Sequence, residues 1–369
     1  MNYKKICTSE AIALIVVVMV NQVLLGSAKE IITDTASSAW IHTILISAIA
    51  LLFTFLICKL FGKFTNLDII DISEFLAGKV LKYIVCIGLI GFFLLSASLI
   101  LNHIANSLSI IYLTNLNVLF LILIFLIGAV YVSKTDIGVI ARTNLIILTI
   151  LLIPMIILFV SIASDMQINN LFPILGYGIN ETFFSNSTNL YAFTGLIYLF
   201  LITPLLKDSS EHKKIGIISI IISSLYLFLT VISLLMSFPF ASVTDDLLSI
   251  YLLSRLVSFG TFLERVDVIY VFLWILSSFS YLSILFYFLT STFQKMTKLK
   301  NRNGILYSLA TIVLGTTILM KDIADLRFAH RTISMYYFLG LFAVLFIILI
   351  LAYFKKRKRE RIQKLWKKP

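Results

Sequence analysis

Two neighbouring amide side chains interrupt the first long apolar run of the chain. Asn21 and Gln22 follow ten consecutive apolar residues, 11–20, and the apolar character resumes at Val23. Polar groups deep in hydrocarbon are costly, so they face protein or serve a function. Two interpretations stay open. The amides hydrogen-bond to another helix, or they mark a broken helix whose freed backbone groups line a ligand site.

A second stretch with unusual residues lies in the apolar run 190–206. Phe193, Thr194 and Gly195 stand in its outer half, and Pro204 stands near its inner end. Proline removes a backbone donor and kinks a helix, whereas glycine lets the backbone approach a ligand closely. Interrupted helices at corresponding places in the two halves of a membrane protein indicate a transporter-type binding site.

Other polar side chains recur at helical spacing. Ser277 and Tyr281 share one helical face, with Ser278 beside them, and Ser98 and Asn102 are four residues apart in an earlier run. Such stripes face the interior of a bundle, where they bind a neighbouring helix or contact a ligand. The candidate ligand-binding residues are Asn21, Gln22, Ser98, Asn102, Phe193, Thr194, Gly195, Ser277, Ser278 and Tyr281.

The remaining reactive residue types form no catalytic or metal-binding pattern. Cys7, Cys58 and Cys86 are odd in number and imply no disulfide framework. The four histidines are scattered, without the spacing of metal ligands. Because the sequence has no nucleophile motif or phosphate-binding loop, we expect neither enzyme activity nor a metal or cofactor. No acidic residue falls in the middle of an apolar run, which argues against proton coupling through a buried carboxylate.

The elements that must position these side chains are membrane-spanning helices. Hydrophobic residues make up 60% of the 369-residue sequence and charged residues 13%, and the mean hydropathy is +1.03. A helix of about 20 apolar residues crosses the hydrocarbon, and lipid forces such segments to be helical. The sequence predicts ten spans, at residues 10–27, 39–60, 83–112, 117–133, 144–164, 190–206, 215–240, 268–293, 304–320 and 333–354.

The distribution of Lys and Arg predicts the orientation. With the N-terminus in the cytoplasm, only Lys29, Arg255, Arg265, Lys321, Arg327 and Arg331 of the 30 basic residues lie outside. Both termini are therefore expected to be cytoplasmic. A signal peptide in residues 1–28 is the alternative, but its removal would spoil this charge pattern.

Ten spans divide into two sets of five. A repeat of an odd number of spans must be inverted, so we expect one domain, 1–354, with repeats at about 10–164 and 190–354. The basic tail, 355–369, is expected on anionic cytoplasmic lipid, and no nucleic-acid partner is expected.

Two segments outside the spans have their own expected structure. Residues 68–83 are amphipathic and predict a short helix on the cytoplasmic face, in which Asp71 and Glu74 have the spacing of a capping box. Residues 247–263 predict a helix outside the membrane. Beside it, Glu264 and Arg265 are expected to brace the loop or meet a partner subunit.

Three segments together resemble the endospore germination permeases, the membrane-spanning B subunits of spore germinant receptors. They are residues 136–142 (DIGVIAR), 170–179 (NLFPILGYGI) and 254–267 (SRLVSFGTFLERVD), the last followed by Trp274. The resemblance extends in order and spacing over nearly the whole chain.

This resemblance implies an all-α, leucine-transporter-type fold of ten helices. It implies a site for a small germinant, usually an amino acid, between the first, third, sixth and eighth spans. It also implies assembly with an A subunit and a lipid-anchored C subunit in the inner membrane of the spore. The alternative is a secondary amino-acid transporter of the same fold.

The first span departs from the family pattern. The family tends to have glycines where this helix unwinds, often with a proline soon after, but residues 20–28 read VNQVLLGSA without proline. Asn21 and Gln22 therefore either supply side-chain amides to the ligand or plug the site. A scaffold that has lost its ligand is a further alternative.

Overall fold

The structure is a computed structural model that describes residues 5–113, 115–245, 249–257, 266–320 and 329–366. Side chains are described throughout these ranges except at 165, 244–250, 266 and 360–366. The described elements are helical, and one isolated bridge joins Ile6 to Leu206.

The first half of the chain supplies long helices joined by short irregular turns. They are α1 (Thr8–Gln22), α2 (Ala28–Thr35), α3 (Ala39–Phe61), α4 (Ile69–Ala77), α5 (Lys79–Ile111), α6 (Val118–Ser133) and α7 (Ile137–Ser161). A π-helical turn, η1 (Val23–Ser27), connects α1 to α2, and a 3-10 turn, η2 (Ala36–Ser38), connects α2 to α3.

The second half begins with short, irregular elements and then returns to long helices. The short elements are η3 (Ile162–Asp165), η4 (Ile168–Leu171), α8 (Ile179–Phe183), η5 (Ser187–Phe193), α9 (Gly195–Leu199), η6 (Thr203–Leu205) and η7 (Ser209–Glu211). The following elements are α10 (His212–Ser237), α11 (Phe240–Asp245), α12 (Ser249–Leu256), α13 (Val266–Thr297), α14 (Arg302–Leu319), η8 (Ala329–Ser334) and α16 (Met335–Trp366).

Each predicted span coincides with a helical segment of the described chain. Among the residues that the structure describes, seven helical stretches are long and apolar enough to cross a membrane, and the first of them, Thr8–Phe61, contains two of the predicted spans. The fourth predicted span is the shorter apolar helix α6. The sixth is not a continuous helix but the succession of η5, α9 and η6. The chain is therefore an all-helical integral membrane protein.

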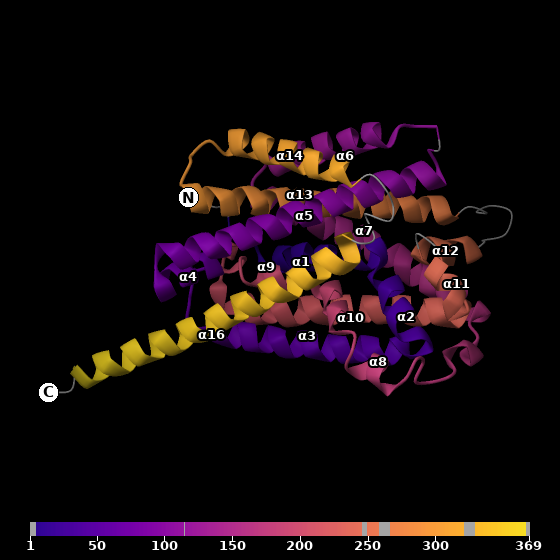
Figure 1. Ribbon diagram of the computed structural model, residues 1–369, viewed down its shortest axis with the longest axis horizontal. Helices are drawn as coiled ribbons and strands as arrows, with labels where there is room; N and C mark the ends of the chain where they lie inside the picture. The colour runs from indigo at the N-terminus through magenta and orange to yellow at the C-terminus, as the bar shows by residue number, and fades with distance from the viewer. Residues whose placement is uncertain (1–4, 114, 246–248, 258–265, 321–328, 367–369) are drawn as a thin grey trace.

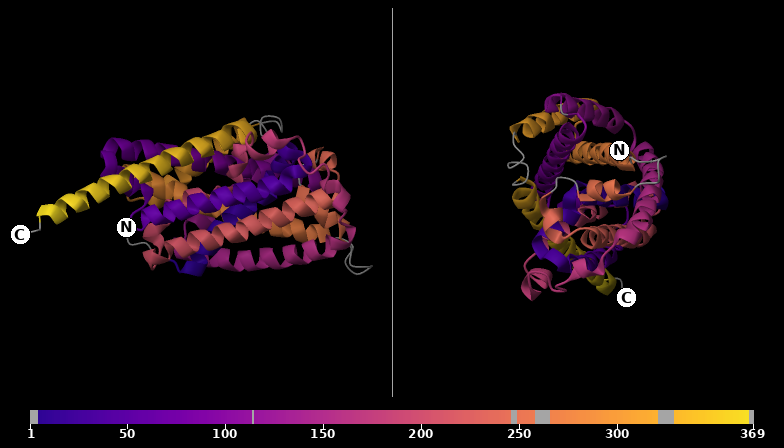
Figure 2. Two further views of the ribbon diagram at one scale, coloured as in Figure 1. Left: turned by 90° about the horizontal axis from the view of Figure 1, so that it is seen from below. Right: turned by 90° about the vertical axis from the view of Figure 1, so that its right-hand side faces the viewer.

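The helices form an elongated bundle around α1 (Figures 1 and 2). Helix α1 contacts α7, α10 and α13, and its residues 13–22 are all buried. A helix that is apolar on every side belongs in such a position. Helix α16 crosses one face of the bundle and extends beyond the other helices (Figure 1).

The predicted helix at 68–83 is shorter in the structure, where α4 covers Ile69–Ala77, and its cap is not the predicted one. Asp68 is the N-cap, and its side chain accepts a hydrogen bond from the backbone N–H of Asp71. In return, the backbone N–H of Asp68 donates to the side chain of Asp71. The predicted pair of Asp71 and Glu74 was wrong by one turn, since Glu74 instead binds Lys82 at 2.7 Å. Gly78, with φ of 80°, ends α4, and α5 begins at Lys79 rather than at residue 83.

The first residues of the basic tail, which was predicted to lie on lipid, contact protein. Lys355 Nζ donates to the backbone oxygens of Phe75 and Leu76 at the end of α4. The lysine thereby satisfies carbonyls that lack partners within α4. Of the predicted outer helix at 247–263, the structure contains α12, whereas Glu264 and Arg265 lie outside the described residues.

Candidate functional site

The first span is interrupted directly after the amide pair. Gly26 has φ of 123°, a conformation that favours glycine, and it lies inside the π-helical turn η1. The Ser27 hydroxyl donates to the backbone oxygen of Gln22 at 2.9 Å, so it satisfies one of the carbonyls that the break frees. The interruption is therefore built into the backbone, about one turn beyond the position that the polar side chains suggested.

The two amides bind the eighth predicted span, α13, through their nitrogen atoms. Asn21 Nδ2 donates to the hydroxyls of Ser277 at 2.9 Å and Ser278 at 3.1 Å. Gln22 Nε2 donates to the Tyr281 hydroxyl at 3.0 Å. Hydrogen bonding to another helix is thus confirmed for the donor half of each amide. The acceptor half is different, because Asn21 Oδ1 and Gln22 Oε1 are buried and have no hydrogen-bond partner among the described residues.

The sixth predicted span brings further polar atoms to the same place. Thr194 is fully buried at the joint between η5 and α9. The hydroxyls of Thr194 and Tyr198 lie near that of Tyr281, yet neither makes a hydrogen bond within the part of the chain that the structure describes. We call Asn21, Gln22, Thr194, Tyr198, Ser277, Ser278 and Tyr281 the central polar cluster.

Tyr198 is a member of this cluster that the sequence did not single out. It lies in a continuous apolar stretch and reads there as a core aromatic residue. Tyr191 was missed for the same reason, although its hydroxyl lies near Gln22 and Ser96. A tyrosine needs a partner for its hydroxyl when it is buried. Two tyrosines within one interrupted span were therefore a signal that could have been used.

Gly195 and Phe193 have a packing role in the structure. The space beside Gly195 is filled by Met19 of α1, whose Cε would lie 2.2 Å from an added Cβ. Phe193 is 1% exposed and belongs to the same core. The glycine thus allows α9 and α1 to approach each other closely.

We expect Gly195→Ala to destabilise the protein by about 1–3 kcal/mol, as overpacking does. A Met19→Ala change should relieve the clash, so the double variant should lose less stability than the two single variants together. Thermal unfolding of the purified variants measures this. Strictly additive losses would show that the two residues do not press on each other.

Ser98 and Asn102 are directed to α14. The Ser98 hydroxyl lies 2.5 Å from that of Thr316. Asn102 Nδ2 donates to the backbone oxygens of Thr317 at 3.2 Å and Met320 at 2.8 Å. These carbonyls lie at the C-terminal end of α14, where the helix leaves acceptors for side chains of other elements. The described bonds of these two residues stay within α5 or join α5 to the end of α14, and none of them reaches the central polar cluster.

Ion pairs connect the elements at both ends of the bundle. At the end that the charge distribution places outside, Arg331 of η8 binds Glu30 at 3.8 Å and also binds Asp34, both on α2. At the opposite end, Lys295 of α13 binds Asp68 and Asp71 of α4. Of the elements that carry the central polar cluster, α13 takes part in these ion pairs.

Comparison with known proteins places this architecture among germination proteins. The sequence model of the family described as "Spore germination protein" matches residues 5–326. Spore germination protein KB of Bacillus subtilis (strain 168) is 24% identical over 341 residues, which cover 88% of each chain. Protein B2 of the same organism is 22% identical over 92% of this chain and 94% of its own. Protein A2 is 23% identical over 96% and 97%.

Solved transporter structures share the fold. Mhp1, a nucleobase-cation-symport-1 family transporter with bromovinylhydantoin bound, has a TM-score of 0.67 at 14% identity, over 96% of this chain and 80% of its own. A Na⁺-coupled sialic acid symporter has a TM-score of 0.62 at 14% identity, over 95% and 79%. The expected transporter-type fold is confirmed at this level. The relatives and structural neighbours are germination proteins and transporters rather than enzymes.

Proposed function

The chain belongs to the spore germination protein family, and on that premise we propose that it is the B subunit of a germinant receptor. In this proposal a small germinant, an amino acid, binds from the outer side at the central polar cluster. The bound state then signals to A and C subunits in the inner membrane of the spore. The relatives KB, B2 and A2, all spore germination proteins, support this assignment.

The observation that carries the proposal is the set of buried polar atoms left without partners at the two interruptions. Asn21 Oδ1, Gln22 Oε1 and the hydroxyls of Thr194 and Tyr198 are all in this condition within the described chain. An unpaired buried polar group costs about 1–3 kcal/mol. A solute that bonds to these atoms recovers that free energy, so the cluster is suited to binding.

The chemistry of these atoms favours an amino acid. The two amide oxygens are acceptors and match an ammonium group, whereas the two hydroxyls can donate to a carboxylate. All four atoms are neutral, so they bind a zwitterion without a net charge in the apolar bundle. Proposed ligand contacts at Ser277 and Ser278 would require Asn21 Nδ2 to release these hydroxyls first.

The arrangement of the helices supports the topology that the charge distribution predicts. Ile6 binds Leu205 of the sixth predicted span and Lys207 directly after it, and Ile69, the first residue of α4, binds Phe200. Lys355 binds the opposite, C-terminal end of α4. Ile6 therefore contacts the end of the sixth predicted span directly, and Lys355 contacts a helix whose first residue binds the same span. This agrees with ten crossings in two inverted sets of five and with cytoplasmic termini.

A germinant acts as a signal only if it prefers one arrangement of the bundle. Equal affinity for two arrangements would shift neither, however tightly the germinant binds. The central polar cluster joins α1, α9 and α13, so a solute bound there can favour one relative position of these elements. The partner subunits would respond to that position.

A secondary amino-acid transporter is the second candidate, favoured by the shared fold with Mhp1 and the sialic acid symporter. One neighbour belongs to a nucleobase-cation-symport family, and the other is a Na⁺-coupled symporter. In this chain, however, the amide nitrogen of Asn21 already donates hydrogen bonds to the hydroxyl oxygens of Ser277 and Ser278. Cations such as Na⁺ need oxygen ligands, and an N–H donor at this position competes with them.

Deletion of the gene in a sporulating host tests the proposal. Spores should lose germination in response to one of the twenty amino acids, applied singly, and keep their response to the others. Radiolabelled uptake of the same amino acid should be unchanged. Normal germination combined with lost uptake would overturn the receptor assignment in favour of a transporter.

A further inference from the structure

The inner part of the sixth predicted span is held by two other segments of the chain. After α9 the backbone is irregular, and its carbonyls need donors from elsewhere. Ile69 N–H donates to the oxygen of Phe200 at 2.9 Å, and Ile6 N–H donates to the oxygen of Leu205 at 2.8 Å. Lys207 N–H returns a bond to the oxygen of Ile6 at 3.0 Å. The first residue of α4 thus contacts the unwound segment directly.

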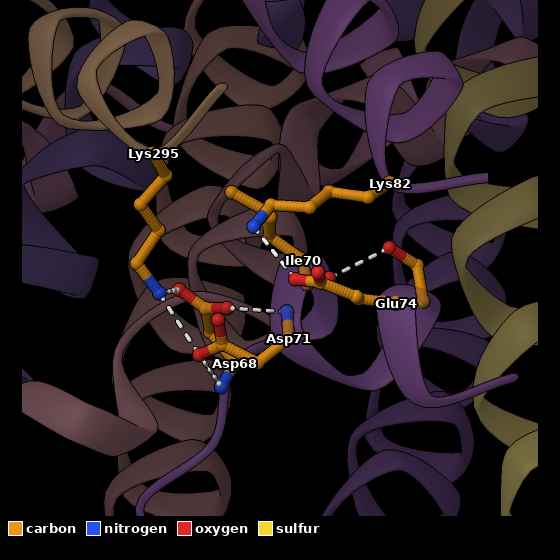
Figure 3. A network of polar contacts seen from close by, with 7 residues as sticks. Asp68, Ile70, Asp71, Glu74, Lys82 and Lys295 are labelled. Atoms are coloured by element: carbon orange, nitrogen blue, oxygen red, sulfur yellow. Dashed lines mark hydrogen bonds and ion pairs between the residues drawn. The ribbon is translucent and has the colours of Figure 1, made fainter. Parts of the chain in front are cut away.

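A buried ion cluster fixes the same end of α4 to α13 (Figure 3). Lys295 Nζ lies 2.5 Å from Asp68 Oδ2 and 3.0 Å from Asp71 Oδ2. Asp68 is only 4% exposed, and Lys295 emerges from the last turns of α13. Two carboxylates share one ammonium group, so the three side chains carry a net negative charge in a largely buried position.

The protonation behaviour of the two carboxyl groups reflects this crowding. Burial raises the pKa of Asp68 to about 6, despite the attraction of Lys295. Burial also acts to raise the pKa of Asp71, but its net pKa is lowered. The lowering comes from the charge and hydrogen bond of Lys295 together with the hydrogen bonds from Asp68. Removal of Lys295 would therefore leave two carboxylates close together without their shared counterion.

A small cavity lies directly beneath the cluster. Its volume is about 30 Å³, room for one or two water molecules. Asp68 and Lys295 line it together with Leu201 and Pro204 of the sixth predicted span and Ser291 of α13. Asp68 and Lys295 of the ion cluster thus border the same cavity as the unwound segment.

Other contacts hold α4 on its far side. Lys82 of α5 binds Glu74, and Lys355 of α16 binds the C-terminal carbonyls of α4 (Figure 3 shows the first of these contacts). These contacts do not line the cavity. They offer a comparison for the Lys295 contacts, because they tie the same helix to the bundle at a different place.

We propose that Asp68, Asp71 and Lys295 form a latch that closes the inner end of the solute path by tying α4 to α13 across the unwound segment. This inference rests on the proposed function in one respect: it assumes that the solute path leads to the central polar cluster. Tyr281 and Lys295 are 14 residues apart on α13, roughly 21 Å along its axis. A displacement of α13 at the central polar cluster therefore also strains the latch.

Chemical access to the cavity tests the latch without any germinant. The reporter is Leu201→Cys in a chain with Cys7→Ser, Cys58→Ala and Cys86→Ala. A charged, membrane-impermeant thiol reagent is applied to inverted membrane vesicles that contain the full chain. With the latch intact, the thiol should react slowly. Lys295→Met should increase the modification rate at least tenfold, because the ion pairs that tie α4 to α13 across the cavity are lost.

Lys82→Met is the matched control, since it breaks an ion pair of the same helix away from the cavity. In the reporter chain that also carries Lys82→Met, the thiol at position 201 should react at the same rate as in the parent reporter. An unchanged rate in Lys295→Met, or an equal rise in Lys82→Met, would overturn the latch. Asp68→Asn, which keeps the shape of the side chain, should give an intermediate rise in the modification rate. If the Lys295→Met protein does not accumulate, the rate in Asp68→Asn decides whether the latch exists. Failure of the germination experiment would leave this result intact.

Discussion

Thr194→Val is expected to make the protein more stable and, at the same time, less sensitive to its germinant. Valine has nearly the shape of threonine but lacks the hydroxyl, which is buried without a partner within the described residues. Removal of an unsatisfied hydroxyl should stabilise the fold by about 1 kcal/mol. If the hydroxyl bonds to the germinant, spores should need about tenfold more of the triggering amino acid, the equivalent of about 1.4 kcal/mol.

Thr203→Val is the matched control for this prediction. Thr203 is also buried in the sixth predicted span, and its hydroxyl is likewise unpaired in the described part of the chain. It lies at the inner end, away from the central polar cluster. The variant should gain similar stability in thermal unfolding and keep the parent dose response in spores. Equal dose responses for Thr194→Val, Thr203→Val and the parent would place the binding site elsewhere.

Thr194→Trp is expected to abolish the germinant response completely in the same experiment. The indole would fill the space at the joint between η5 and α9, so we expect no response at any concentration of the triggering amino acid. Immunodetection of the variant in the spore membrane must show normal amounts. A normal dose response in this variant would contradict the proposed site more strongly than the valine result.

Gly26→Ala is expected to remove the germinant response by damaging the interruption of the first span. At φ of 123° a residue with a Cβ is strained, at a cost of about 1–3 kcal/mol. An added Cβ would meet no atom within 4 Å, so the effect arises from the backbone conformation and not from a clash. The chain should relax toward a continuous helix, which moves Asn21 and Gln22 relative to α13. We expect a lower melting temperature and at least a tenfold weaker response.

Gly340→Ala separates this effect from a general effect of alanine. Gly340 lies within α16, and an added Cβ there would also meet no atom within 4 Å. Because its backbone is helical, alanine should stabilise the protein by about 0.5–1 kcal/mol. The dose response of these spores should equal that of the parent. Stability losses of the same size in Gly26→Ala and Gly340→Ala would show that the conformation of Gly26 is not responsible.

The two interruptions illustrate how far local sequence reaches. Proline and a Gly-containing polar stretch predicted the break in the sixth span, because these residues change what the backbone itself can do. In the first span the prediction rested on the polarity of Asn21 and Gln22, but both residues are helical and the break follows at Val23–Ser27. Polarity shows which residues must avoid lipid, and it does not show which backbone angles they adopt.

The partners of polar side chains were beyond the reach of periodicity. Ser98 and Asn102 have the four-residue spacing of a protein-facing stripe, and they do face protein. Their partners lie on α14, more than 200 positions later in the chain. The cap of α4 shows the same limit, since both Asp68 and Asp71 precede a suitable acidic residue. The bond from Ile69 to Phe200 places the beginning of the helix at Asp68.

By itself, the sequence determined that this protein is a helical membrane protein, where its apolar segments run, and which residues favour an interruption in two of them. These properties follow from hydropathy and from the conformational limits of glycine and proline, which act within a few residues. Only the tertiary structure decided that the Asn21 amide binds Ser277, 256 positions away, and that Met19 fills the space beside Gly195. The physical reason is that a polar group in a bundle accepts whichever complementary group lies opposite it, and helix packing alone determines which group that is.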